Sequence, residues 1–348
     1  MRIPVCGIVS IMALCLPAAG RAEVYDLPVD GSDVIGAVTT VIARADDTLV
    51  DIARQHGLGY EDMVIANPNV DVWLPGAGTE VVLPTRYVLP QGARKGVVLN
   101  LAEYRMYYYP QAKPGERPVV MTFPVSIGRM DWETPLGLTR VVSKVRNPAW
   151  YPPDSVRAEH EADGRPLPRI VPPGPDNPLG NFAMRLGLPG YLIHGTNRPA
   201  GVGMRVTHGC IRMFPEDIEY LFEQLSTETP VRIINEPLKV GWDGDELVLE
   251  VHRHLAAKPP EDATLADVAD ILAEVEETAE LAESLAEDPL AAQAEGLSSL
   301  TAQFVAATQS REGAIDWEVA ERQLAAPSGI PLTIGRSIKN AATSAAFE

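Results

Sequence analysis

The sequence predicts a mainly β protein: a β-sandwich or barrel domain, preceded by a small β-α-α-β module and followed by an acidic helical extension. The chain has 348 residues, a length that favours more than one domain. Its 31 prolines and 28 glycines show no repeat period, and they separate short runs typical of strands. Residues 255–348 hold 5 basic and 17 acidic residues, so negative charge gathers near the C-terminus.

The composition is that of a globular protein. Hydrophobic residues make up 46% of the chain and charged residues 22%, values that allow a real interior. The formal net charge of -18 has the wrong sign for a surface that neutralises phosphates. We therefore expect no nucleic-acid partner.

Residues 1–22 read as a secretory signal peptide. Arg2 precedes an apolar run from Ile3 to Leu16, and small residues follow as far as Ala22. The run is shorter than the ~20 residues of a membrane-spanning helix. We expect cleavage near residues 20–22, export to the periplasm and no membrane span in the mature chain. Cys210 is then the only thiol that remains.

Residues 39–85 have the pattern of a β-α-α-β module. Strand-like runs flank two helix-like stretches, residues 48–57 and 60–66, and Thr48 is placed to cap the first. The segments Asp46-Asp47-Thr48-Leu49 and Asn67-Pro68, with the closing Val81-Val82-Leu83-Pro84, resemble the LysM family. This resemblance implies binding to the glycan strands of peptidoglycan. A packing module without a ligand is the alternative.

Residues 92–236 carry the β-rich pattern. The sequence predicts strands over residues 97–101, 105–109, 119–127, 138–144, 191–194 and 231–234. The spacing of apolar residues predicts a helix from Pro215 to Leu225. Residues 147–178 are crowded with proline, which favours a long ordered loop or lid.

The rest of the chain divides into a strand-like extension, residues 237–254, and an acidic, partly helical region, residues 255–348. Helical spacing of apolar residues begins at Leu265 and continues in an alanine- and glutamate-rich stretch to Glu287. Residues 317–334 are apolar enough to dock on a domain.

The residues that carry chemistry lie in two short stretches, His194-Gly195-Thr196 and Thr207-His208-Gly209-Cys210-Ile211-Arg212. A nucleophilic cysteine needs a base, donors for an oxyanion and room for the substrate. Both histidines are candidate bases, and the backbone around Gly209 is a candidate oxyanion site. Folding could bring both imidazoles to the one sulfur.

These two stretches resemble the signature of the L,D-transpeptidase catalytic domain, also called the YkuD domain, of the periplasmic type with an N-terminal LysM-like module. The resemblance implies that Cys210 is the nucleophile and His194 its base, oriented by the carbonyl of Gly195. It further implies oxyanion donors at Gly209 and Cys210.

The same resemblance implies assisting residues. His208 is expected to assist in proton transfer, and Arg212 is expected to hold the loop or to bind a substrate carboxylate. Thr207 and Tyr191 are predicted to contact the substrate. A nearby imidazolium is expected to lower the pKa of the Cys210 thiol.

The implied reaction removes the terminal D-alanine from a peptidoglycan tetrapeptide stem and leaves an acyl thioester on the enzyme. An amine of a second stem then gives a 3→3 cross-link, an amine of an envelope protein anchors that protein, and water gives an L,D-carboxypeptidase or hydrolase. The sequence leaves these acceptors open. No cofactor is implied.

Two other readings compete with the thiol enzyme. His194, His208 and Cys210 are acceptable zinc ligands, but the sequence has no further zinc motif, and we predict no metal site. His252 and His254 are predicted to lie at a solvated strand end. A noncatalytic peptidoglycan-binding protein is the second alternative.

Overall fold

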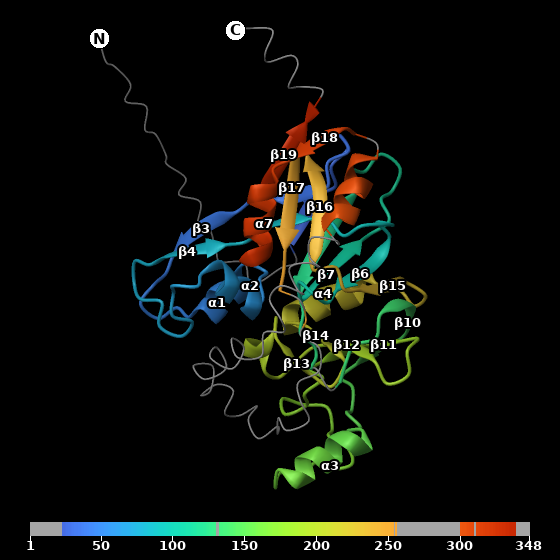
Figure 1. The fold of residues 1–348 in the computed structure, drawn as a ribbon. Coiled ribbons are helices and arrows are strands. Elements are labelled where there is room, and N and C mark those ends of the chain that lie inside the picture. The colour runs from blue at the N-terminus through green and yellow to red at the C-terminus, as the bar shows by residue number, and fades with distance from the viewer. Residues whose placement is uncertain (1–22, 130–131, 254, 256–299, 310, 339–348) are drawn as a thin grey trace, which may run out of the picture.

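The computed structural model describes residues 23–129, 132–253, 255, 300–309 and 311–338. A curled nine-stranded sheet forms its centre (Figure 1). In spatial order the strands are β1 (Glu23–Asp26), β8 (Val119–Pro124), β7 (Arg105–Tyr109), β6 (Gly96–Asn100), β15 (Pro230–Ile234), β10 (Gly137–Arg146), β11 (Phe182–Leu186), β12 (Leu192–His194) and β14 (Ile211–Arg212). The pairs β6–β15 and β12–β14 are parallel, and the other neighbours are antiparallel. The prediction of a mainly β protein is confirmed.

One helix closes the main core of this sheet. Helix α4 (Pro215–Gln224) buries Ile218, Leu221 and Phe222 on the face that the sequence predicted. Phe222 packs against Phe182 of β11, with 5.0 Å between the ring centroids. Burial of this apolar surface holds the sheet edge that carries β12 and β14.

The β-α-α-β module forms as predicted from its secondary structure. It consists of β3 (Thr39–Ile42), α1 (Leu49–Gln55), α2 (Tyr60–Ala66) and β4 (Glu80–Leu83), and β3 pairs antiparallel with β4. The Thr48 hydroxyl accepts a hydrogen bond from the Asp51 amide at 3.0 Å, so the predicted cap is confirmed.

The module packs on the nine-stranded sheet and on α4 rather than hanging from a linker. Arg54 of α1 makes two hydrogen bonds to the Glu216 carboxylate of α4, at 2.7 and 2.8 Å. Arg105 of β7 pairs with Asp62 of α2 at 2.6 Å. The two-pronged contact between Arg54 and Glu216 fixes orientation as well as distance.

A second sheet combines two strands that precede residue 254 with two strands near the end of the described chain. Its order is β16 (Leu238–Asp243), β17 (Glu246–Val251), β19 (Leu332–Ser337) and β18 (Gly313–Ile315), with α7 (Trp317–Ala325) packed against it. The extension and the acidic region, which the sequence separated, thus share one sheet, because the apolar residues of β19 complete the open edge of β17. Docking of residues 317–334 is confirmed. The helix predicted from Leu265 lies outside the described residues.

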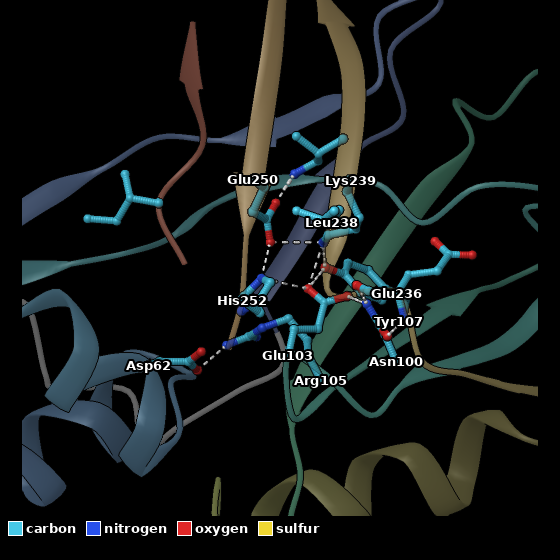
Figure 2. A network of polar contacts seen from close by, with 12 residues as sticks. Asp62, Asn100, Glu103, Arg105, Tyr107, Glu236, Leu238, Lys239, Glu250 and His252 are labelled. Carbon is cyan, nitrogen blue, oxygen red and sulfur yellow. Dashed lines mark hydrogen bonds and ion pairs between the residues drawn. The ribbon is translucent and has the colours of Figure 1, made fainter. Parts of the chain in front are cut away.

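Buried charges join the second sheet to the first (Figure 2). Lys239 of β16 is 0% exposed, and its ammonium lies 2.7 Å from Glu103 and 2.9 Å from Glu250. His252 Nε2 lies 2.6 Å from Glu250 Oε1. The prediction of a solvated strand end at His252 is therefore wrong, because the side chain is buried beside the carboxylates of Glu250 and Glu103. His254 lies outside the described residues.

The remaining elements are short. They are β2 (Val34–Gly36), which pairs with β5 (Arg86–Val88); β9 (Ile127–Gly128), which pairs with β13 (Arg205–Thr207); the 3-10 turn η1 (Pro199–Gly201); and α3 (Asp154–Ala162). Helix α3 lies within the proline-rich stretch predicted as a loop, and it buries Val156. In Figure 1 it lies at the opposite end of the molecule from the second sheet. Among the described helices, none has the length and apolarity needed to cross a membrane.

Candidate active site

The parallel pairing of β12 with β14 brings the two predicted stretches together. His194 is in register with Arg212, and Ile193 with Ile211. Cys210 directly precedes β14 and stands two residues before Arg212. The charge of Arg212 acts on both groups: it adds to the burial that lowers the pKa of His194, and it opposes the burial that raises the pKa of the Cys210 thiol.

His194 is held as a neutral imidazole. Its side chain is buried, with 5% of the residue exposed, and Nδ1 lies 2.6 Å from the Gly195 carbonyl oxygen. A carbonyl can only accept, so Nδ1–H donates and Nε2 keeps its lone pair. Burial, followed by the charge of Arg212, lowers the pKa of His194 to about 3, against the opposing effect of the Gly195 bond.

Cys210 is half-buried, and its sulfur donates a weak hydrogen bond to the Gly190 carbonyl at 3.6 Å. Burial raises the pKa of the thiol, although a backbone bond from Leu192 and the charge of Arg212 oppose this. The expected lowering of the thiol pKa by an imidazolium is therefore wrong. Burial disfavours both the thiolate and the imidazolium, so the resting pair is a neutral thiol and a neutral base.

The backbone around the thiol is tightly constrained. Gly209 has φ +92°, and an added Cβ would lie 2.8 Å from Cε1 of Tyr191. The Thr134 hydroxyl donates to the Gly209 carbonyl at 2.9 Å, and the Thr207 hydroxyl donates to the Cys210 carbonyl at 2.5 Å. Both peptide groups that flank Cys210 are therefore anchored by a threonine.

His208 has a different partner from the one expected. Its Nε2 contacts the Glu159 carboxylate of α3 at 3.1 Å, and the Trp132 ring packs on it edge-to-face, with 5.2 Å between the centroids. Glu159 also pairs with Arg129 at 2.8 Å. Within the described residues, no hydrogen bond joins His208 to the thiol. Glu159 was not predicted as a site residue, because no motif in the neighbouring sequence indicates one.

Arg212 has an unusual environment. In the part of the chain that the structure describes, its guanidinium has no carboxylate partner, and its Nε is buried without a hydrogen bond. Burial and the charge of Arg198 lower the pKa of Arg212 to about 10. A buried cation without an anion favours binding of an anionic group from outside the chain.

Tyr191 lies beside Gly209, and its hydroxyl donates to the Glu133 carbonyl at 3.2 Å. The residues from Trp132 to Thr134 and the residue before β12 thus meet over the glycine that precedes the thiol. Tyr191 therefore lies against the backbone of Gly209.

Within the described chain, side chains that could bind a metal ion cluster away from Cys210. Glu103, Glu250 and His252 have potential ligand atoms within 4.8 Å of one another. The ammonium of Lys239 lies between the two carboxylates and supplies the positive charge there. His194, His208 and Cys210 do not form such a group among the described residues.

At one edge of the curled sheet lie a thiol, a neutral imidazole and an arginine that has no carboxylate partner among the described residues. These groups make the edge a candidate active site of a cysteine acyltransferase. The model of the YkuD family, described as the L,D-transpeptidase catalytic domain, matches residues 94–233. The chain belongs to the L,D-transpeptidase family and is a transpeptidase enzyme.

Similar proteins come from Escherichia coli K12. The probable L,D-transpeptidase YcfS is 42% identical over 261 residues, which cover 73% of this chain and 79% of YcfS. The probable L,D-transpeptidase YbiS is 39% identical, with coverage of 71% and 80%. The probable L,D-transpeptidase ErfK/SrfK is 41% identical, with coverage of 68% and 76%.

Proposed function

We propose that this enzyme acts on peptidoglycan in the periplasm with Cys210 as its nucleophile. The donor is a tetrapeptide stem, which is cut between the diamino acid at the third position and the terminal D-alanine. The observation that supports the proposal is the register of β12 with β14, because it brings the end of the strand that carries His194 beside the strand that directly follows Cys210.

The first half-reaction follows from the neutral resting pair. His194 Nε2 takes the proton from the Cys210 sulfur as the sulfur attacks the carbonyl carbon of the diamino acid. Amide hydrogens of Gly209 and Cys210 stabilise the resulting oxyanion. The intermediate collapses with transfer of the proton to the leaving nitrogen, so D-alanine departs and a thioester remains.

The second half-reaction transfers the acyl group. His194 accepts a proton from the incoming amine, the amine nitrogen attacks the thioester carbon, and the thiol is regenerated. The acceptor is the diamino acid of a second stem, which gives a 3→3 cross-link, or an amine of an envelope protein. Water as the acceptor would instead make an L,D-carboxypeptidase.

Arg212 is proposed to bind a carboxylate of the stem. Its buried guanidinium lacks an anion in the described chain, and a stem carboxylate would supply one. Tyr191 and Thr207 are proposed to line this region. His208, which contacts Glu159, is proposed to act on the position of α3 rather than on the thiol proton.

The module of residues 39–85 is proposed to bind glycan strands as a LysM domain, and residues 1–22 to direct export. Packing of the module on α4 through Arg54 and Glu216 would then hold a bound glycan strand in a fixed relation to the catalytic site.

The test is intact-protein mass spectrometry with a tetrapeptide stem. We expect an acyl adduct and release of D-alanine with the wild type, and neither with Cys210→Ala. Analysis of treated sacculi then separates the acceptors: 3→3 dimers, wall-bound protein or shortened stems. Absence of an adduct on the wild type, with binding to sacculi retained, would favour the noncatalytic alternative.

A further inference from the structure

Thr134 lies outside both sequence stretches that carry the chemistry, yet its hydroxyl joins two parts of the catalytic region. It accepts a hydrogen bond from the Gly128 amide at 3.1 Å and donates one to the Gly209 carbonyl at 2.9 Å. The residue is 5% exposed. Because Gly128 can only donate and the Gly209 carbonyl can only accept, the direction of the hydroxyl proton is fixed.

The bond to Gly209 fixes a peptide plane. The Gly209–Cys210 peptide is trans and planar, so its C=O and the Cys210 N–H point in opposite directions. A hydroxyl that holds the carbonyl oxygen therefore also sets the direction of the Cys210 amide hydrogen. Gly209 has φ +92°, a backbone conformation that glycine adopts more readily than any other residue.

The backbone around Gly209 is closely packed on both sides. A Cβ added to Gly128 would lie 2.9 Å from the Gly209 Cα, so the two backbones touch. Thr134 spans both, while the Tyr191 ring closes the other side. The hydroxyl is the polar group placed to hold the peptide in this gap.

We infer that Thr134 is a positioning residue of the oxyanion site: its hydroxyl aims the Cys210 amide at the charge that develops during acylation. The inference rests on the proposed function, since it needs an oxyanion beside Cys210. Thr134 itself touches no reacting atom.

The experiment compares two reactions of the same thiol. Acylation by a tetrapeptide stem passes through an oxyanion, whereas alkylation by iodoacetamide displaces iodide without one. Thr134→Val removes the hydroxyl at nearly constant volume, and Thr134→Ser keeps it. Thr85→Val is the matched control, because the Thr85 hydroxyl is also buried, at 8% exposure, and also donates to a backbone carbonyl, that of Ala37 at 2.7 Å.

We expect Thr134→Val to lower the acylation rate constant at saturating stem by about 10- to 100-fold, somewhat less than the loss of a whole oxyanion donor. Its alkylation rate and half-saturating stem concentration should stay within about twofold of the wild type, because neither depends on the oxyanion. Thr134→Ser should restore acylation, and Thr85→Val should leave it unchanged.

Two results would overturn the inference while the wild type acylates normally. One is a Thr134→Val variant that acylates as fast as the wild type. The other is equal loss of acylation and alkylation, which would mean that the hydroxyl supports the thiol itself. A wild type that alkylates but never acylates would refute the proposed function, and the inference would fall with it.

Discussion

Gly59 and Gly203 are in backbone contact across the boundary between the module and the catalytic domain. A Cβ added to Gly59 would lie 2.7 Å from the Gly203 Cα. The amide of Tyr60, the next residue, donates to the Val202 carbonyl at 3.0 Å. The start of α2 is thus hydrogen-bonded to the loop that leads into the Thr207–Arg212 stretch.

Gly203→Ala should weaken both folding and acylation. Gly203 has φ +91°, and its added Cβ would lie 2.3 Å from the Tyr60 nitrogen, so the module must shift. We expect the free energy of unfolding in urea to fall by about 2–4 kcal/mol, from overpacking and backbone strain together. Gly78→Ala is the control, since Gly78 has φ +88° with no atom within 4 Å of the added Cβ. Equal losses in the two variants would show that the contact is unimportant.

Lys239→Met should destabilise the chain strongly. The substitution leaves Glu103 and Glu250 buried without their ammonium, a change that typically costs about 3–5 kcal/mol. Lys113→Met, at the exposed pair with Glu116, should change the free energy of unfolding by less than about 0.5 kcal/mol. Urea denaturation at pH 7 measures both, and similar values for the two variants would contradict the assignment of a buried network.

His194 should make folding pH-dependent. Its pKa is lowered from 6.5 to about 3 by burial and by Arg212, so the unfolded chain binds a proton that the folded chain does not. Stability attributable to His194 is therefore complete above pH 6.5 and declines as the pH falls from there toward 3. In urea titrations from pH 4 to 7, His194→Gln should lose less stability on acidification than the wild type. A parallel pH profile for the two proteins would rule this out.

Cys210 should react slowly with alkylating agents at neutral pH. Burial raises the pKa of the thiol above its ordinary value of 9, so the thiolate is a minor species at pH 7. The iodoacetamide rate should rise with pH and show no plateau below pH 9. A rate that is already constant between pH 6 and 8 would instead indicate a preformed thiolate. The same burial protects the thiol from sulfenic acid formation at rest.

Glu159→Gln should loosen α3. Glu159 pairs with Arg129 and contacts His208, and loss of its charge weakens both contacts. We expect faster limited proteolysis within residues 147–178, with alkylation of Cys210 unchanged. Glu161→Gln, an exposed position in the same helix, is the control. Identical cleavage rates for the two variants would argue against a role of Glu159 in holding α3.

The sequence predicted the parts of the fold and site that depend on neighbouring residues. The strand from Arg105 to Tyr109 has its predicted bounds, and the helix that begins at Pro215 ends one residue before its predicted end, because alternation and helical spacing are local signals. The stretch around Cys210 was found in the same way, since its chemistry lies in consecutive residues.

Features that depend on distant residues were missed. Strand β16 carries the buried Lys239, and one of its two carboxylate partners, Glu103, lies far away in the chain, so the pattern of β16 did not indicate a buried strand. Glu159 and Thr134 reach the catalytic region only after folding. The direction of the thiol pKa shift was wrong for the same reason: the extent of burial comes from tertiary packing.

The pairing of β19 with β17 has a consequence for biosynthesis. The residues of β17 are synthesised long before those of β19. The edge of β17 that pairs with β19 therefore stays unpaired until the later segment is available. The sheet that carries Lys239 can therefore be completed only once residues 332–337 are present, which makes its closure a late step in folding.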